Sequence, residues 1–305
     1  MTSGIQAATL QQATADRRRL RGFLTRAMLL GPAMLFLTLV YVVGLLYLFR
    51  YSFNHYTGTG IERTFSAEAY ARFLTDPFYH QIMGEGFRLG GVTTVCCLLI
   101  GYPVAYAVSR LRDQRLVLVS YVVIFSPLLV SVIVRSYGWM LLLARTGIVN
   151  YVLLRLNIIA EPLHLLYDFF GVAVALVHVL LPFAIFPIAS VFDQFDPALK
   201  DAAADLGADR LRTFWHVTFP LSLPGLVSAF QLTFVLSMTA YVTPRLLGGG
   251  RVTVMPILIY ESLTVLNWPL TAVMSIALLA VVLTLVFFYN ELLVKHVYSR
   301  MGLGV

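Results

Sequence analysis

Few residues of this 305-residue chain have the types and spacings that covalent chemistry needs. The six histidines show no ligand pattern such as H-E-x-x-H, which places two imidazoles on one helix face for zinc. The only lysines, Lys200 and Lys295, do not follow glycine, so no G-x-x-x-x-G-K-[ST] phosphate-binding loop is present. Cys96 and Cys97 are adjacent, whereas metal sites need spaced ligands. We therefore predict no catalytic residue, no metal site and no cofactor bound by the chain itself.

One arginine, Arg135, interrupts an apolar run, close to Tyr137 and Trp139. An ionisable residue at membrane depth is expensive and is a functional candidate by default. Two interpretations stay open. Arg135 either reaches the outer interface or pairs with a carboxylate such as Asp168 or Glu261, or it lines a solute pathway. In a pathway it would bind a carboxylate in bidentate fashion and repel a polyamine.

A polycationic solute would need carboxylates and aromatic faces instead. Carboxylates near the apolar runs all lie close to their ends, at Glu85, Asp168, Glu261 and Glu291. Aromatic side chains could supply cation–π contacts, although each also fits a packed core or an interfacial belt. The candidate solute-pathway residues are Arg135, Tyr137, Trp139, Gln231 and Tyr241.

The elements that would position these residues are membrane helices. Apolar residues make up 59% of the chain and charged residues 12%, against about 25% in a soluble protein. Runs long enough to cross a bilayer cover residues 27–49, 89–109, 116–143, 169–192, 221–242 and 270–294. We predict an all-α polytopic membrane protein with six transmembrane helices in one domain, 27–297, between polar tails at 1–26 and 298–305.

Arginine clusters orient these helices. The densest lie before the first run, within residues 17–26, and between the second and third runs, within 110–115. Such clusters collect on the cytoplasmic side, so both termini are predicted to be cytoplasmic. The net charge of +7 then reflects topology rather than nucleic-acid binding.

Two outer segments carry structure of their own. Ser66–Leu74 spaces apolar residues along one helix face. Leu247–Pro269 is semi-apolar and is interrupted by Gly248-Gly249-Gly250 and Pro256. Because non-helical backbone at membrane depth must be covered by protein or water, this stretch is either a re-entrant, gate-lining segment or an ordinary surface loop.

The connection over 193–220 is long for a link between helices and reads as two short helices. Asp196 is a predicted N-cap, with Pro197 in the first turn. Gly207 ends the first helix, because glycine enters the left-handed conformation without strain. A second helix, about Asp209–Val217, should stop before Pro220. Alanines 202–204 leave one side nearly bare, which predicts a docking element.

This segment resembles the EAA loop of permease subunits in binding-protein-dependent ABC importers. Asp201-Ala202-Ala203, Gly207, Val217 and Pro220 match that pattern, with Asp201 in place of glutamate and Phe219 in place of leucine. The resemblance implies the type I importer fold, and a coupling helix seated in a partner ATPase, which binds ATP and Mg. By this resemblance and position, the coupling residues are Asp201, Ala202, Ala203, Gly207 and Phe214.

A longer resemblance, spanning roughly Phe87–Val297, is to the first permease subunit of spermidine/putrescine importers. It rests on Pro127–Trp139, Val242–Gly250 and Leu263–Trp268. It implies a bacterial inner-membrane location, a second, different permease subunit, two cytoplasmic ATPases and a periplasmic solute-binding protein. The implied solute is a polyamine, and the alternative is an opine or another small amine or carboxylated compound.

Two other classes fit the residues less well. A stand-alone secondary transporter needs a coupling site, usually buried midplane carboxylates, and none of the six runs has one. A membrane enzyme needs a nucleophile–base or metal constellation, which the spacing of histidines and acids does not provide.

Overall fold

The computed structural model describes residues 28, 30–58, 60–62, 64–196 and 198–291, with the side chains of Lys200 and Asp201 excepted. The two predicted tails, together with Ala27, Pro197 and the predicted end of the sixth span, lie outside these residues.

Six stretches within the described ranges are long and apolar enough to cross a membrane. The first is the helix Leu30–Tyr51. The others are α3 (Pro77–Val108), α5 and α6 together (Val132–Leu143 and Ile148–Arg155), α7 (Phe169–Phe192), a run formed by α9, η1 and α10 (Arg210–Thr213, Phe214–Thr218 and Phe219–Met238), and α13 (Trp268–Tyr289). The prediction of an all-α membrane protein with six crossing helices is confirmed.

The centre of the bundle is formed by α3, α7 and α10, which pack against one another. Small residues lie where these helices approach most closely. A Cβ added to Gly225 of α10 would lie 3.0 Å from the carbonyl oxygen of Pro187 in α7, and one added to Gly101 of α3 would lie 3.3 Å from the Cβ of Ala184. Without a hydrophobic driving force between helices in lipid, this close backbone packing stabilises the bundle.

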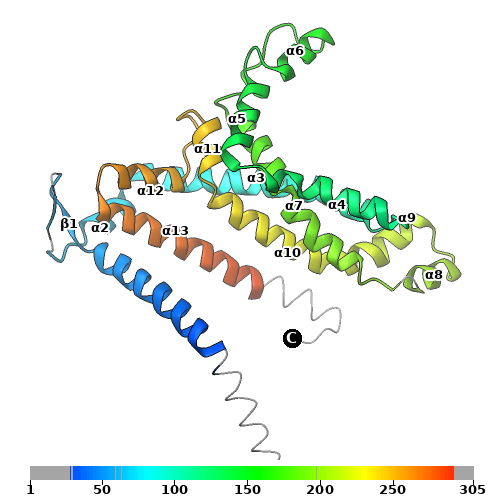
Figure 1. Cartoon of the computed structure of the whole chain (residues 1–305), viewed down its shortest axis with the longest axis horizontal. Coiled ribbons are helices and arrows are strands. Elements are labelled where there is room, and N and C mark those ends of the chain that lie inside the picture. Colours follow the sequence, from blue (N-terminus) through cyan, green and yellow to red (C-terminus); the bar gives the residue numbers. More distant parts are fainter. Residues whose placement is uncertain (1–27, 29, 59, 63, 197, 292–305) are drawn as a thin grey trace, which may run out of the picture.

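The structure differs from the prediction at the third run. In place of one helix over 116–143 it has α4 (Gln114–Leu129) and α5, joined by extended backbone at Val130, whose φ and ψ are −94° and 136°. Pro127 removes one backbone donor from the last turn of α4, and the β-branched Val130 and Val132 favour extended backbone. As a result, α5 turns away from α4, and α5 and α6 project from the bundle (Figure 1).

The outer elements gather at one end of the molecule. A short hairpin of β1 (His55–Tyr56) and β2 (Ile61–Glu62) and the helices α2 (Glu68–Thr75) and α12 (Met255–Thr264) lie opposite α8 and α9 (Figure 1). The predicted helix in Ser66–Leu74 is therefore present as α2, with Phe73 buried.

The glycine-interrupted stretch forms a turn between α11 (Val242–Leu247) and α12. Gly249 and Gly250 have φ values of +54° and +79°, which explains why glycine stands at both positions. After this turn, α12 packs against α13, and Asn267 caps α13 by accepting a hydrogen bond from the backbone N–H of Leu270.

Candidate functional site

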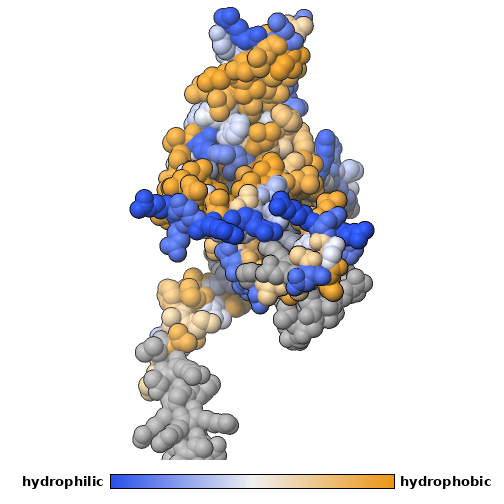
Figure 2. Space-filling model, turned by 90° about the vertical axis from the view of Figure 1, so that its right-hand side faces the viewer, coloured by the Kyte–Doolittle hydropathy of each residue, from blue (hydrophilic) through white to orange (hydrophobic). Residues whose placement is uncertain are grey.

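The connection over 193–220 lies at one end of the molecule, as the helix α8 (Ala198–Asp205), a turn and α9 (Figure 1). Figure 2 views this end, where hydrophilic residues form a band across the surface. The opposite end carries the hairpin and α2, so the connection is exposed on a face remote from the outer elements.

The caps of α8 are those that the sequence predicts. Oδ1 of Asp196 accepts a hydrogen bond of 2.9 Å from the backbone N–H of Ala198. At the other end Gly207 has a φ of +76°; its N–H donates to the carbonyl of Ala204, and the N–H of Ala208 donates to that of Ala203. These two hydrogen bonds form a Schellman motif, which satisfies the last helix carbonyls and fixes the direction in which the chain leaves.

One side of α8 and its turn is uncovered. Ala202 and Ala204 are exposed, whereas Ala203 faces inward and is buried. Leu206 is 88% exposed and Leu199 is 46% exposed, although both side chains are apolar. An exposed apolar surface rimmed by polar residues is typical of a protein-binding face.

The second helix differs from the prediction, because it does not stop before Pro220. Helical backbone runs without interruption from Arg210 through Pro220 to Met238. The segment η1 is a π-helical turn, and its widened turn accommodates the proline that follows in the first turn of α10. The helix α9 is thus continuous, through η1, with the fifth membrane helix, α10.

Phe214 connects this segment to the other helices. Its ring lies 6.1 Å from that of Tyr102 and 5.9 Å from that of Tyr106, both on α3, measured between centroids. These tyrosines also contact Phe192, at the end of α7, at 5.6 and 5.5 Å. Such tilted ring pairs are favourable at 4.5–7 Å. We call Tyr102, Tyr106, Phe192 and Phe214 the aromatic junction.

Beside the aromatic junction is a cavity of about 980 Å³. Its walls come from the C-terminal ends of α3 and α7 and from α8, α9 and η1, and include Ser109, Asp193, Ala204 and Thr213. The exposed segment is therefore held to the bundle through the rings at one side rather than through a filled core.

The structure gives Arg135 a partner that neither prediction named. Its guanidinium Nη1 donates to the backbone carbonyl of Pro127, rather than to Asp168 or Glu261. Asp168 instead caps α7, and Glu261 pairs with Arg245 at 2.5 Å. Arg135 is only 9% exposed, so it does not reach an interface within this chain.

The other predicted pathway residues lie partly on the helix of Arg135 and partly elsewhere in the bundle. The indole N–H of Trp139 donates to Nδ1 of His178 on α7 at 3.2 Å, and Tyr137 is 53% exposed. Gln231 lines a largely apolar cavity of about 210 Å³ between α3, α10 and α13. The ring of Tyr241 lies 5.0 Å from that of Tyr260 on α12. Arg135, Tyr137 and Trp139 thus share α5, and Tyr241 packs in the same hydrophobic cluster as Trp139, whereas Gln231 lies apart from them.

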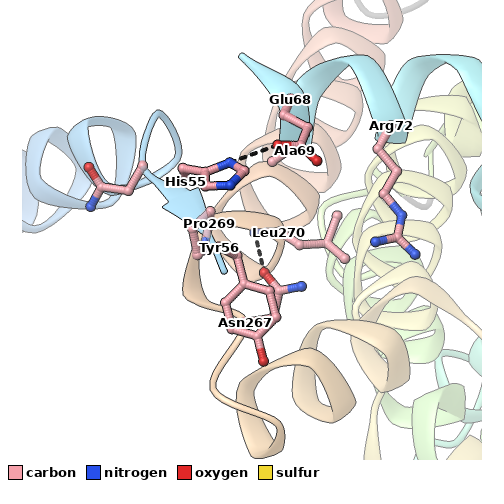
Figure 3. Close-up of a pocket in the computed structure, with 9 residues that line it drawn as sticks. His55, Tyr56, Glu68, Ala69, Arg72, Asn267, Pro269 and Leu270 are labelled. Carbon is pink, nitrogen blue, oxygen red and sulfur yellow. Dashed lines mark hydrogen bonds and ion pairs between the residues drawn. The ribbon is translucent and has the colours of Figure 1, made fainter. Parts of the chain in front are cut away.

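Sequence reasoning missed the group that attaches the first helix to the bundle. Nδ1 of His55 and Oε2 of Glu68 lie 2.7 Å apart at a small pocket that Arg72, Asn267 and Leu270 also line (Figure 3). No periodicity or motif joins these residues, because they come from the hairpin, α2 and the start of α13.

The fold and this exposed segment are consistent with an integral membrane component of a transport system. The sequence model of the binding-protein-dependent transport system inner membrane component family matches residues 98–299, and the chain belongs to this family. It is a multi-pass protein of the bacterial inner membrane and a permease subunit of an ABC importer.

Its relatives include the spermidine/putrescine transport system permease protein PotB of Haemophilus influenzae. That protein is 33% identical over 228 residues, which cover 73% of this chain and 79% of the relative. PotB of Escherichia coli is 30% identical over 219 residues, covering 72% and 79%. The chain also resembles YdcU of Escherichia coli, an inner membrane ABC transporter permease protein, at 29% identity over 237 residues, covering 72% and 74%.

Two solved structures share the fold. One is a bacterial ABC transporter that imports the acidic polysaccharide alginate; it has a TM-score of 0.71 at 17% identity and covers 89% of this chain and 95% of its own. The other is a bacterial alginate ABC transporter in complex with an alginate pentasaccharide-bound periplasmic protein, with a TM-score of 0.70 at 16% identity and coverage of 93% and 96%.

Proposed function

We propose that this chain forms one wall of a polyamine pathway and couples it to ATP hydrolysis by partner ATPases on the cytoplasmic side. The observation that carries the coupling role is the aromatic junction. It joins η1 to the ends of α3 and α7; the exposed helix α8 contacts η1, and η1 continues into α10. A force applied to α8 would therefore reach the three central helices together. ATP and Mg belong to the ATPases.

The names of the relatives support a polyamine as the solute. Arg135 does not decide between a polyamine and an opine or another carboxylated compound, because its Nη1 donates to the Pro127 carbonyl while its buried Nε has no hydrogen-bond partner among the described residues.

A second, different permease subunit would complete the pathway. Leu30–Tyr51 has no residue of its most apolar window buried in this chain and diverges from the bundle beyond its attached outer end (Figure 1). Tyr51 contacts Trp268, and the hydroxyl of Ser52 lies 2.8 Å from that of Tyr70. The open side of this helix suits a neighbouring subunit, with lipid around the remainder.

The proposed orientation follows from the same elements. With both termini cytoplasmic, α8 and α9 face two ATPases, and the hairpin, α2 and α12 face a periplasmic solute-binding protein. The arginines at 110, 112, 210 and 212 then lie inside, as the positive-inside rule expects.

Reconstitution tests this function. The chain is purified with its second permease and ATPases, placed in proteoliposomes and supplied with spermidine-loaded binding protein. ATP-dependent accumulation of labelled spermidine is expected, with none when the ATPase lacks its catalytic glutamate. Uptake that needs a proton gradient but no ATPase would instead establish a secondary transporter. Transport of an opine but not of spermidine would refute the proposal that the solute is a polyamine.

A further inference from the structure

We propose that a pocket at the outer mouth of the bundle binds one ammonium group of the incoming solute, in the position that the side chain of Arg88 now occupies. This inference rests on the proposed function and adds a place of first contact. The pocket has a volume of about 220 Å³ and lies between α3, the start of α7 and the turn after Gly250. Its polar and charged lining residues are Gln81, Glu85, Arg88, Asp168, Arg251 and Thr253.

The structure already holds a cation in this pocket. The guanidinium carbon of Arg88 lies 4.3 Å from the centre of the Phe169 ring, and its Nη1 lies 3.4 Å from Oε1 of Glu85. An aromatic face beside a carboxylate is the arrangement that attracts alkylammonium groups. Arg88 thus shows that the walls suit a cation.

Arg88 is a displaceable occupant. Its side chain is 60% exposed, and its ion pair with Glu85 is long and near the surface. Exposed ion pairs of this kind are weak, so the long side chain of Arg88 can leave the pocket for water. Glu85 is more enclosed, with a side chain that is 35% exposed, and remains to bind the replacement.

Asp168 supplies a second carboxylate. It also caps α7, where its Oδ2 accepts a hydrogen bond from the backbone N–H of Phe170. With Arg88 in place the four charges of the pocket cancel. When Arg88 leaves, Glu85 and Asp168 outnumber Arg251, and the pocket becomes net negative, which favours a polyvalent cation.

The size of the pocket limits what it holds. Pockets that enclose a whole small ligand measure roughly 300–1,000 Å³. At about 220 Å³ this one accommodates the aminoalkyl end of a polyamine, while the remainder of the solute extends along the wall. The site therefore distinguishes a cationic end from an anionic one, not one polyamine from another.

Equilibrium binding to the assembled importer, without ATP or binding protein, tests the site with labelled spermidine as the probe. Glu85→Gln and Asp168→Asn should each weaken binding on the order of fivefold, about the effect of one exposed charge contact. Asp168→Asn keeps the helix cap, because asparagine caps as well as aspartate. Arg88→Gln should strengthen binding severalfold, since it removes the internal competitor.

The opposite signs separate a binding role from a structural one, because loss of a structural ion pair would act in the same direction for Glu85→Gln and Arg88→Gln. Matched controls come from the pocket of Figure 3: Glu68→Gln and Arg72→Gln alter the same charges at the same end of the bundle and should leave binding unchanged. Equal losses for Glu85→Gln and Arg88→Gln, or no spermidine binding by any variant, would overturn the site.

ATP-driven uptake of spermidine by the unaltered importer distinguishes a failure of the proposed ammonium-binding pocket from a failure of the proposed function. If spermidine is imported but the binding pattern is absent, only the subsite is refuted. If octopine binds in place of spermidine and Glu85→Gln strengthens its binding, the pocket is an anion site and the proposal is overturned.

Discussion

The guanidinium of Arg135 donates a hydrogen bond to the carbonyl of Pro127 across the break between α4 and α5. The last carbonyls of a helix lack partners within it, and a cation near that end is favourable. Arg135 therefore closes the end of α4 from the first turn of α5 and fixes the angle at which α5 leaves. An arginine inside an apolar run, which the sequence marks as a pathway candidate, has a structural partner here.

Arg135→Leu should destabilise the importer. It leaves the Pro127 carbonyl with only the long 3.4 Å hydrogen bond from the backbone N–H of Val130, at a cost of about 1–3 kcal/mol. We expect a lower Tm of the purified complex, measured by intrinsic fluorescence, and partial recovery with Arg135→Lys, which restores one donor. An unchanged Tm would show that the bond from Arg135 to the Pro127 carbonyl does not stabilise the fold.

Gly207→Val should uncouple transport from hydrolysis. Nothing lies within 4 Å of the Cβ it would add, so the strain comes from the φ of +76°. A left-handed residue other than glycine costs roughly 1–2 kcal/mol, and more when β-branched. Spermidine imported per ATP hydrolysed should fall several-fold.

Two control variants test whether the effect of Gly207→Val comes from the left-handed backbone. Gly207→Asn, which tolerates the left-handed region, should retain most coupling. Gly84→Val, at a helical glycine with equal open space, should change nothing. Normal transport by Gly207→Val would show that the turn does not set the position of α8.

Phe214→Ala should break the aromatic junction while the ATPase remains bound. Each ring pair contributes about 0.5–1.5 kcal/mol beyond its buried area, so loss of the contacts to Tyr102 and Tyr106 loosens η1 from α3. ATP hydrolysis should persist while uptake drops. Trp215→Ala, which removes a 55% exposed side chain, should weaken ATPase binding instead. If spermidine imported per ATP hydrolysed is the same in wild type and Phe214→Ala, the aromatic junction does not couple hydrolysis to transport.

A photo-crosslinking residue at Leu35 should capture the second permease. Leu35 is 68% exposed on the first helix. A cross-linked product with the combined mass of this chain and the second permease is expected in gels of the assembled importer. It should be absent from gels of the chain purified alone. Cross-links to lipid in both preparations would show that this helix faces the bilayer.

Local signals predicted much of this structure. The caps at Asp196 and Gly207 follow from rules that act within a few residues, and the apolar runs follow from the thickness of the bilayer. The elbow at Val130–Ser131 does not, because proline is tolerated inside membrane helices and Pro127 alone does not indicate a break.

The candidate site divides in the same way. The exposed segment proposed to couple transport to hydrolysis has a local sequence pattern, so candidate residues could be named from the sequence. By contrast, Glu85 and Phe169 meet around Arg88 only because α3 packs against α7, and their separation in the chain carries no signal. The partner of Arg135 was missed because a backbone carbonyl, unlike a carboxylate, has no identifiable residue type.

The most direct measurement is the exposure of Leu206 in a cryo-EM structure of the assembled importer. In the isolated chain this side chain is 88% exposed on the turn after α8. The coupling role predicts that Leu206 becomes buried against an ATPase subunit, with Phe214 still packed on Tyr102 and Tyr106. A fully assembled importer in which Leu206 stays exposed and no ATPase contacts α8 would contradict it.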